Sequence, residues 1–204
     1  MTVGILDIGH GNFGSLKRVI EKAGGKADYI SSVPRLANCS KLILPGVGHF
    51  DSAMQVLKSS ILLEPLLMRV LEDKIPFLGI CLGMQLLCRN SEEGVEPGLG
   101  LIDASVKKFK FRSSLKLKVP HMGWNTVDPL RSNPLLPITL KEERFYFVHS
   151  YHVVPDNDTL SICNTNHGGS FCAAFQKDNI FGVQFHPEKS HRFGINLISR
   201  FLNF

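Results

Sequence analysis

The first half of the chain alternates short apolar runs with segments in which apolar residues recur at helical spacing. After the first run, for example, Leu16 and Ile20 fall on one face of a predicted helix. Strands that alternate with helices in this way predict a parallel sheet covered by helices on both faces. The predicted strands are Val3–Ile8, Ala27–Ile30, Lys41–Leu44 and Phe77–Ile80, and the predicted helices are Phe13–Ala23, Asp51–Asp73 with a kink or second helix at Pro65, and Leu82–Arg89.

The second half of the chain changes to short strand-like segments separated by turn residues, and it ends in a helical segment. No internal repeat, low-complexity stretch or Pro/Ser-rich linker separates the two halves. We therefore expect one α/β domain over residues 1–204, built on an open, three-layer, mostly parallel mixed sheet. The predicted strands are Ser105–Phe111, Leu115–Pro120, Arg144–His149, Leu160–Cys163, Phe171–Phe175 and Ile180–Phe185, and the predicted helix is Phe193–Phe201.

Composition supports a globular protein and excludes several other classes. Hydrophobic residues make up 44% and charged residues 20% of the chain, which argues against disordered, collagenous and coiled-coil proteins. The first residues do not resemble a signal peptide, and the longest nearly apolar run, Ile75–Leu87, is too short to span a bilayer. Five cysteines without a CxxC pair predict free thiols, so we expect a cytoplasmic protein.

The net charge of +5 is concentrated in one segment, residues 107–118, and the remainder of the chain is close to neutral. Two phenylalanines, Phe109 and Phe111, lie among the basic residues, so a nucleic-acid-binding strip is one interpretation. A pair of strands with one apolar and one solvated face is the interpretation we favour. The basic residues are Lys107, Lys108, Lys110, Arg112, Lys116 and Lys118.

A G-x-G-x-x-G motif, Gly9 to Gly14, lies between the first predicted strand and the first predicted helix. In dinucleotide-binding domains these glycines let the backbone approach a pyrophosphate at the helix N-terminus. The acidic residue that such domains need after the second strand is not convincing, because Asp28 lies inside that strand. A tight glycine turn is therefore favoured, and a dinucleotide-binding oxidoreductase remains an alternative.

The most specific motif is Gly79-Ile-Cys81-Leu-Gly83, where a buried strand leads directly into a helix. This is the sulfur equivalent of the nucleophile elbow, a sharp turn that presents its central side chain. Glycines on both sides leave room where any Cβ would crowd the turn. We therefore predict that Cys81 is a nucleophile rather than a structural thiol.

A cysteine nucleophile needs a base and a group that orients the base. His186 follows the apolar strand ending at Phe185, and Glu188 lies two residues further on. Together with Cys81 they form a candidate Cys–His–Glu triad, whose members assemble in space rather than in sequence. The backbone N–H of Leu82 and the glycine-bearing loop Pro45–Gly48 are the candidate donors to an oxyanion.

These motifs resemble those of the class I (triad) glutamine amidotransferases. The residues that carry the resemblance are Pro45–Gly48, Gly79–Gln85 and Phe185–Glu188. Pro120–Asn125, Tyr146–Tyr151 and His186–Ser190 narrow the resemblance to the glutaminase subunits of imidazole glycerol phosphate synthase, a histidine-biosynthesis enzyme. The resemblance spans nearly the whole chain and implies a flavodoxin-like sheet.

By this resemblance, Cys81 attacks the side-chain amide of L-glutamine, His186 protonates the departing ammonia and activates water, and Glu188 orients His186. The resemblance also implies that Val47 and Leu82 form the oxyanion hole, and that no metal or organic cofactor takes part. A (β/α)8-barrel cyclase partner would receive the ammonia in a heterodimer and make imidazole glycerol phosphate and an aminoimidazole carboxamide ribotide. The expected glutamine-binding residues are Gly48, Gln85, Ser150 and Tyr151, and those near the partner are Asn12, Trp124, Tyr146 and Lys189.

Two alternatives stay open at this point. Ile8 and His167-Gly168 depart from the family pattern, which has Tyr and Tyr-Gly there, so a paralogue that feeds ammonia to a surface-sugar-modifying synthase is possible. His149 and His152 form an H-x-x-H pair that would suit zinc. Alternation along a strand would place these two side chains on opposite faces, which argues against a metal site.

Overall fold

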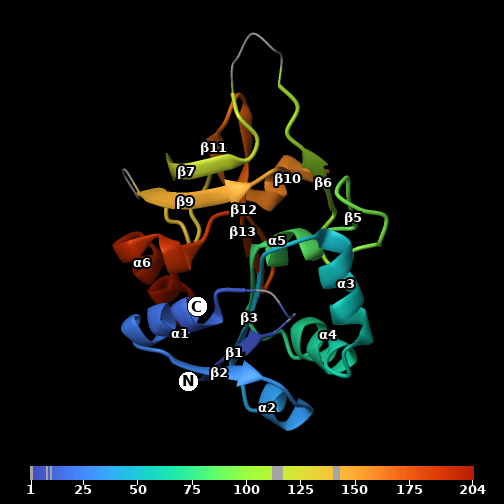
Figure 1. Cartoon of the computed structure of the whole chain (residues 1–204). Coiled ribbons are helices and arrows are strands. Elements are labelled where there is room, and N and C mark those ends of the chain that lie inside the picture. Colours follow the sequence, from blue (N-terminus) through green and yellow to red (C-terminus); the bar gives the residue numbers. More distant parts are fainter. Residues whose placement is uncertain (1, 8, 10, 112–116, 140–142) are drawn as a thin grey trace.

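The computed structural model of the chain describes residues 2–7, 9, 11–111, 117–139 and 143–204. Its largest feature is an eight-stranded sheet, in which five strands run parallel and three more join by antiparallel pairing (Figure 1). This confirms the predicted α/β class with a mixed, mostly parallel sheet. From edge to edge the strands are β2 (Lys26–Ile30), β1 (Thr2–Leu6), β3 (Lys41–Gly46), β4 (Phe77–Cys81), β13 (Ile180–Val183), β12 (Ser170–Lys177), β11 (Ser161–Asn166) and β8 (Asp128–Pro129).

Helices cover both faces of this sheet and give the predicted three layers (Figure 1). One face carries α1 (Phe13–Lys22) and α6 (His191–Leu202). The other carries α3 (Phe50–Ser59), α4 (Leu63–Leu71) and α5 (Leu82–Leu86). A short helix that the sequence pattern did not predict, α2 (Val33–Ala37), follows β2. None of the helices in the described ranges has the length and apolar character needed to cross a bilayer.

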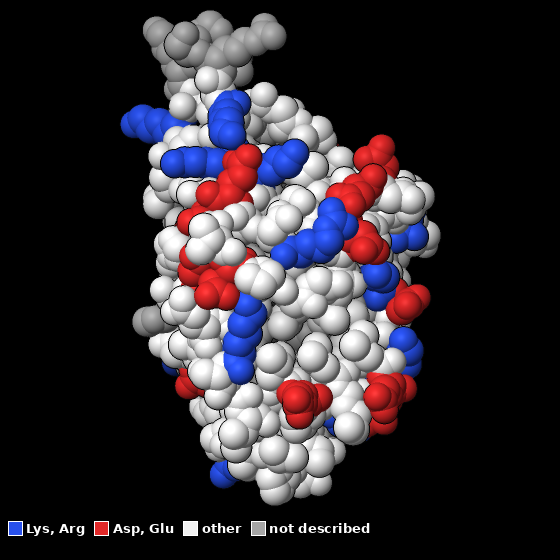
Figure 2. Space-filling view, turned by 90° about the vertical axis from the view of Figure 1, so that its right-hand side faces the viewer, with Lys and Arg blue, Asp and Glu red and all other residues white. Residues whose placement is uncertain are grey.

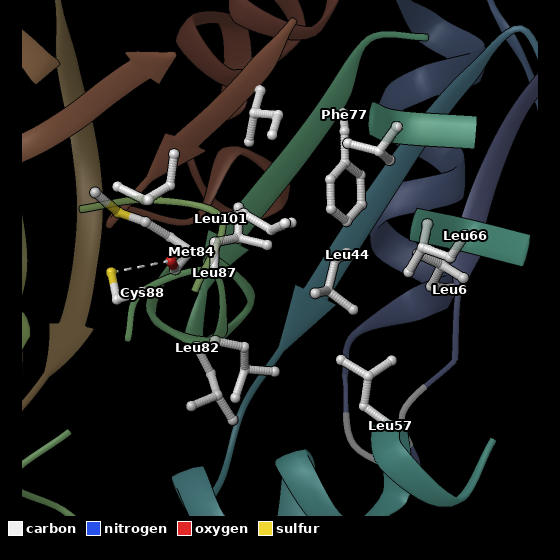
Figure 3. Packing of buried hydrophobic residues seen from close by; sticks show 14 of the residues in the cluster. Leu6, Leu44, Leu57, Leu66, Phe77, Leu82, Met84, Leu87, Cys88 and Leu101 are labelled. Carbon is white, nitrogen blue, oxygen red and sulfur yellow. Dashed lines mark hydrogen bonds between the residues drawn. The ribbon is translucent and has the colours of Figure 1, made fainter. Parts of the chain in front are cut away.

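Both faces of the sheet are buried against these helices. On the α3 and α4 side, Leu44 of β3 and Phe77 of β4 belong to one apolar cluster with Leu66 of α4 (Figure 3). On the other side, a second cluster joins Ile43 of β3 to Leu197 of α6. Because successive strand residues point to opposite faces, a strand covered on both sides must be apolar throughout. The unbroken apolar runs in the sequence therefore reflect burial on both faces.

Two smaller sheets lie next to the large one. β6 (Ala104–Lys108) lies between β10 (Tyr151–Pro155) and β5 (Asn90–Ser91). β7 (His121–Thr126) pairs with β9 (Arg144–His149). A 3-10 turn, η2 (Asp158–Leu160), precedes β11, and another, η3 (Pro187–Lys189), leads into α6. The antiparallel half of the chain thus adds to the parallel sheet, as predicted.

The helix predicted over Asp51–Asp73 is divided into α3 and α4, as the proline suggested. The break comes before Pro65, at Ser60, whose Oγ accepts a hydrogen bond from the N–H of Leu62 at 3.2 Å. Pro65 lies in the first turn of α4, where its missing N–H costs no helical hydrogen bond.

The helix predicted over Leu82–Arg89 is too long, because α5 ends at Leu86. The carbonyl oxygens of Leu86 and Cys88 accept hydrogen bonds from the backbone N–H groups of Leu99 and Gly100, at 2.9 and 3.1 Å. The backbone N–H of Arg89, which a helix reaching this residue would donate to the Gln85 carbonyl, donates instead to the carbonyl of Ala104 at 3.0 Å. Contacts with segments more than ten residues away therefore end the helix early.

The strand predicted over Leu115–Pro120 is wrong in its described part, since 117–120 form no strand and 115–116 lie outside the described residues. The strand of this region is β7, which begins at His121, directly after the end of the predicted strand. Pro120 does not belong to it because proline has no N–H to donate to a neighbouring strand. β6 consequently pairs with β10 and β5, so the basic strand pair expected over 107–118 is also wrong. Ile8, at the end of the first predicted strand, lies outside the described residues.

Replacing Gly83 by alanine is expected to destabilise the fold, because the added Cβ would lie 1.8 Å from the carbonyl oxygen of Leu44. Overpacking typically costs about 1–3 kcal/mol, and a clash with backbone belongs at the upper end or beyond. Urea unfolding measures the loss. The matched control is Gly14→Ala in α1, where the nearest atom to the new Cβ is 4.0 Å away and no loss is expected. Equal midpoints for the two variants would contradict the close packing of α5 on β3.

Candidate active site

Cys81 lies at a sharp turn between β4 and α5. Its backbone has φ +54° and ψ −109°, a conformation that residues other than glycine rarely adopt. A Cβ on Gly79 would lie 2.8 Å from the Cα of Met84, and a Cβ on Gly83 would overlap the Leu44 carbonyl. The turn therefore requires glycine on both sides of Cys81, which confirms the nucleophile-elbow geometry predicted from the sequence.

Three neighbouring parallel strands end at the same place. Gly46, the last residue of β3, is the register partner of Cys81, and β13 lies on the other side of β4. Their carboxyl ends open into a cavity of about 500 Å³. This is the edge where open α/β sheets place their ligands. The predicted site residues that line it are Val47, Gly48, Cys81, Leu82, Gln85, Ser150, Tyr151, His186 and Lys189.

Glu188 lies behind the histidine rather than in the cavity wall. Its Oε1 is 2.7 Å from Nδ1 of His186, and both side chains are almost fully buried. The backbone also holds His186, whose N–H donates to the Tyr146 carbonyl at 2.9 Å while its carbonyl accepts from the Ser190 hydroxyl at 2.6 Å. Burial alone would lower the pKa of His186, but the negative charges of Cys81 and Glu188 outweigh it and raise this pKa to about 10. The imidazole is therefore held in its protonated form.

The thiol of Cys81 lies among polar groups of the cavity wall. Nε2 of Gln184 donates to Sγ at 3.7 Å, and Sγ lies 4.0 Å from the carbonyl oxygen of Val148. Nε2 of His186 is buried and has no well-aligned hydrogen-bond partner within the described ranges, but the Cys81 sulfur is close enough to raise the pKa of the imidazole. Looser contacts of this kind are common before substrate binds.

The other four cysteines have a different environment. All five thiols are free and buried, but only Cys81 lines the cavity just described. Burial raises the pKa of each of the others, which disfavours the reactive thiolate. They are Cys39, Cys88, Cys163 and Cys172.

Two polar residues of the site were missed by sequence reasoning. Gln184 is completely buried and links the side chain of Gln85, at 3.1 Å, to the thiol. A polar residue inside an apolar strand is the signal that would have found it. Glu93 lines the cavity, and its Oε2 accepts the N–H of Phe50 at 2.9 Å. Its position in a Glu-Glu pair of a loop gives no such signal.

The residues predicted to face a partner lie together beside the cavity. Trp124 is 45% exposed and stacks on His191 with ring centroids 5.6 Å apart. Its edge meets Tyr146 at 6.2 Å, and Nζ of Lys189 lies 5.7 Å from the centre of the same tyrosine ring. Asn12 is exposed at the start of α1, where it lines a small cavity that His186 and Glu188 also line.

The glycine motif behaves as a turn. Gly9 has φ +84°, which favours glycine, and its N–H donates to Asp7 at 2.8 Å. Asp28, the only candidate for the acidic residue of a dinucleotide site, pairs with Arg35 at 3.0 Å. His10 of the motif lies outside the described residues. These contacts favour the turn over the dinucleotide alternative.

The basic segment does not form an open stacking strip. Figure 2 shows Lys and Arg side chains gathered toward the upper end of this face, with acidic side chains among them. Nζ of Lys110 lies 3.3 Å from the Glu92 carboxylate, and Phe109 is buried rather than available to a base. Arg112 and Lys116 lie outside the described residues.

His149 and His152 do not lie on opposite faces, so that part of the sequence argument is wrong. The backbone bends at Ser150, between β9 and β10, and both imidazoles contact the ring of Phe109, at centroid distances of 5.3 and 4.4 Å. Across the described parts of the chain, no group of three or more His, Cys, Asp or Glu is arranged to hold a metal ion.

Known proteins resemble this chain over its whole length. The sequence pattern of the family described as "Glutamine amidotransferase class-I" matches residues 5–203. The imidazole glycerol phosphate synthase subunit HisH 2 of Methanococcus maripaludis is 47% identical over 200 residues, 98% of each chain. HisH 2 of Pseudomonas aeruginosa is 45% identical over 97% of each chain. HisH of Methanocaldococcus jannaschii is 43% identical over 98% of each chain.

Solved structures support the fold. A PurLQS structure from Thermotoga maritima superimposes with a TM-score of 0.74 at 16% identity, over 99% of this chain and 97% of that one. A glutamine amidotransferase structure gives a TM-score of 0.70 at 18% identity, over 96% and 98%. At these identities the likeness concerns the fold alone. From the match over residues 5–203 and the relatives that share more than two fifths of its residues, the chain belongs to the class-I glutamine amidotransferase family.

Proposed function

We propose that this chain is the glutaminase subunit of an imidazole glycerol phosphate synthase in histidine biosynthesis, and that it hydrolyses L-glutamine to glutamate and ammonia. The observation that carries the proposal is the meeting of Cys81 and His186 at one cavity of about 500 Å³, with the Glu188 carboxylate directly behind the imidazole. The similarity to HisH chains along the full length supports the pathway.

In the first half of the reaction, the thiolate of Cys81 attacks the side-chain amide carbon of glutamine. The oxyanion that forms accepts hydrogen bonds from the backbone N–H groups of Leu82 and Val47, both at the cavity wall. The His186 imidazolium donates its Nε2 proton to the amide nitrogen, the C–N bond breaks, and ammonia leaves a thioester on Cys81. Because the pKa of His186 is raised to about 10, the imidazole carries this proton at neutral pH.

In the second half, water replaces ammonia. Neutral His186 takes a proton from the water, whose oxygen attacks the thioester carbon and re-forms the oxyanion. Collapse breaks the C–S bond and releases the new carboxylic acid, which loses its proton to solvent as glutamate, and the thiolate is left beside the imidazolium. Glu188 stabilises the imidazolium through the 2.7 Å contact to Nδ1 and fixes the ring orientation in both halves.

Recognition of free glutamine requires groups for its ammonium and its carboxylate. Glu93 is the acidic side chain of the cavity wall, and its carboxylate suits the substrate ammonium. Gly48, with φ +108°, lets the backbone of its loop approach the substrate. Gln85 and the Ser150–Tyr151 backbone line the remaining wall and supply neutral hydrogen-bonding groups.

Ammonia release requires an acceptor close by, because free ammonia would diffuse away. The exposed Trp124, stacked on His191 beside Tyr146, is a suitable anchor for a partner protein. We assign this surface, with Lys189 and Asn12, to a (β/α)8-barrel cyclase in a heterodimer. The whole chain, residues 1–204, acts as one amidotransferase domain, and its five free thiols suit the cytoplasm.

A second candidate function is ammonia supply to a different synthase, such as one that modifies a surface sugar. Two of the relatives, at 47% and 45% identity, are numbered HisH 2, which favours a second type of chain within the family. Both candidates use the same triad and differ only in the partner.

Replacing Cys81 by serine should reduce glutamate release by more than about 1000-fold, because the nucleophile is lost. In complex with the histidine-pathway cyclase, the variant should still form imidazole glycerol phosphate from added ammonium. Cys39→Ser, at a buried thiol away from the cavity, is the control and should keep glutaminase activity. Hydrolysis retained in the Cys81 variant would refute the triad. An active wild-type glutaminase that does not support the cyclase would instead favour the second candidate.

Replacing Glu188 by glutamine should move the alkaline limb of the kcat/KM profile to lower pH. The carboxylate helps to raise the pKa of His186, so its removal lets the imidazolium lose its proton earlier as pH rises. The displacement should be about one pH unit or more, as for a lost charge at this distance. Glu64→Gln, on the exposed side of α4, should leave the limb in place. An unmoved limb in the Glu188 variant would show that the carboxylate does not act on the base.

A further inference from the structure

Two buried histidines that the reaction above does not use lie beside the cavity, and one of them, His149, forms part of its wall. His149 ends β9 and His121 begins β7, and the two are direct register partners across the strand pair. They are 6% and 5% exposed, and Nδ1 of His121 lies 3.0 Å from Nε2 of His149. A hydrogen bond between two imidazoles requires one nitrogen to donate and the other to accept. The other hydrogen-bond partners of the two imidazoles show which ring donates and which accepts.

The partners at each end fix both tautomers. Nδ1 of His149 lies 2.7 Å from the carbonyl oxygen of Tyr151, which only accepts, so this nitrogen carries the proton. Nε2 of neutral His149 then accepts from Nδ1 of His121. Nε2 of His121 in turn accepts from Nδ2 of Asn125 at 3.1 Å. The amide orientation of Asn125 is set independently, because its Nδ2 also donates to the Asn166 carbonyl and its Oδ1 accepts the Thr126 N–H.

The same carbonyl of Tyr151 connects this chain of hydrogen bonds to the substrate wall. It also accepts from Nε2 of Gln85 at 3.1 Å, and that nitrogen donates its other proton to Oε1 of Gln184 at 3.1 Å. Both protons of the Gln85 amide are thereby committed to the protein. Its Oε1 is the atom that remains for a hydrogen-bond donor of the ligand.

We propose that His149 and His121 are positioning residues, which as a relay of neutral imidazoles fix the Tyr151 carbonyl and thereby the orientation of the Gln85 amide toward glutamine. The inference rests on the proposed function, since Gln85 and Tyr151 matter here as glutamine-binding groups. All hydrogen bonds of the relay have the same direction: Asn125 donates to His121, His121 donates to His149, and His149 donates to the Tyr151 carbonyl at the cavity.

The surroundings of the relay keep both rings neutral. Phe147 stacks on His121 at 4.8 Å, and Phe171 packs against His149 at 5.4 Å. Burial lowers the pKa of His121 to about 4 and that of His149 to about 3, and the neighbouring imidazoles of His152 and His167 add to the effect on His149. Protonation of His149 would place its Nε2–H against the Nδ1–H of His121, so the relay holds together only when neither ring is charged.

Two substitutions at position 149 separate the hydrogen bond from simple packing. His149→Phe keeps an aromatic ring among the rings of Phe109 and Phe171 but removes the donor to the Tyr151 carbonyl. The KM for glutamine should then rise about tenfold, because one buried hydrogen bond is lost, and kcat should change less. His149→Asn loses ring volume, but its Nδ2 occupies the place of Nδ1 and keeps the donor, so KM should return to within about threefold of wild type. If His149 only filled space, His149→Asn should raise the KM more than His149→Phe does.

The matched control is His152→Phe, because His152 stacks on Phe109 in the same cluster but bonds to neither end of the relay. Its KM should stay within about twofold of wild type. Nitrogen-15 spectra of the wild-type chain provide a measurement without turnover: both His121 and His149 should be neutral Nδ1–H tautomers from pH 6 to 8. An unchanged KM in His149→Phe, or Nε2–H tautomers, would overturn the relay. If the wild-type chain fails to hydrolyse glutamine, the proposed function falls, and the spectra alone decide the relay.

Discussion

The contact between Gly83 of α5 and the Leu44 carbonyl of β3 determines much of the site. A helix that starts immediately after a buried strand must cross back over the sheet at once, and it can do so only if its first turn lies against bare backbone. The cost is borne at Cys81, whose positive φ belongs to the strained conformations that cluster at functional sites. In return the thiol projects from the carboxyl edge of the sheet, next to the loop that follows β3. Each other group of the site is arranged around this fixed point.

Polar groups in the cavity wall hold one another through hydrogen bonds. Gln184, the first residue after β13, is fully buried, yet both ends of its amide have partners, Gln85 and the thiol of Cys81. His121 and His149 extend the same hydrogen-bonded chain away from the cavity. Buried polar networks stabilise one arrangement only when every member is satisfied. A cavity wall whose hydrogen-bonding groups are fixed in this way can distinguish the oxygen of an amide ligand from its nitrogen.

The sequence was most informative where chemistry and local geometry coincide. Glycines at 79 and 83 reveal the elbow because no other residue fits, and His186 and Glu188 are recognisable because the carboxylate follows the imidazole by two positions, with Pro187 between them. The early end of α5 and the pairing of β6 with β10 were not predictable, since both depend on hydrogen bonds to distant segments. Glu93 reaches the cavity only because its loop is bound to the start of α3. A local sequence pattern does not show which distant residues will be hydrogen-bond partners.

The backbone bond between His186 and Tyr146 links two surfaces of the molecule. The histidine lines the cavity, whereas the tyrosine lies beside the exposed Trp124, and one 2.9 Å hydrogen bond joins their backbones. If the two residues move together, a protein that binds one position of this tyrosine more tightly than another also biases the position of the His186 imidazole. By thermodynamic reciprocity, a ligand in the cavity whose affinity depends on that position then changes the affinity for the protein by the same factor. Occupancy of the cavity and affinity for the second protein are thus two measures of one equilibrium.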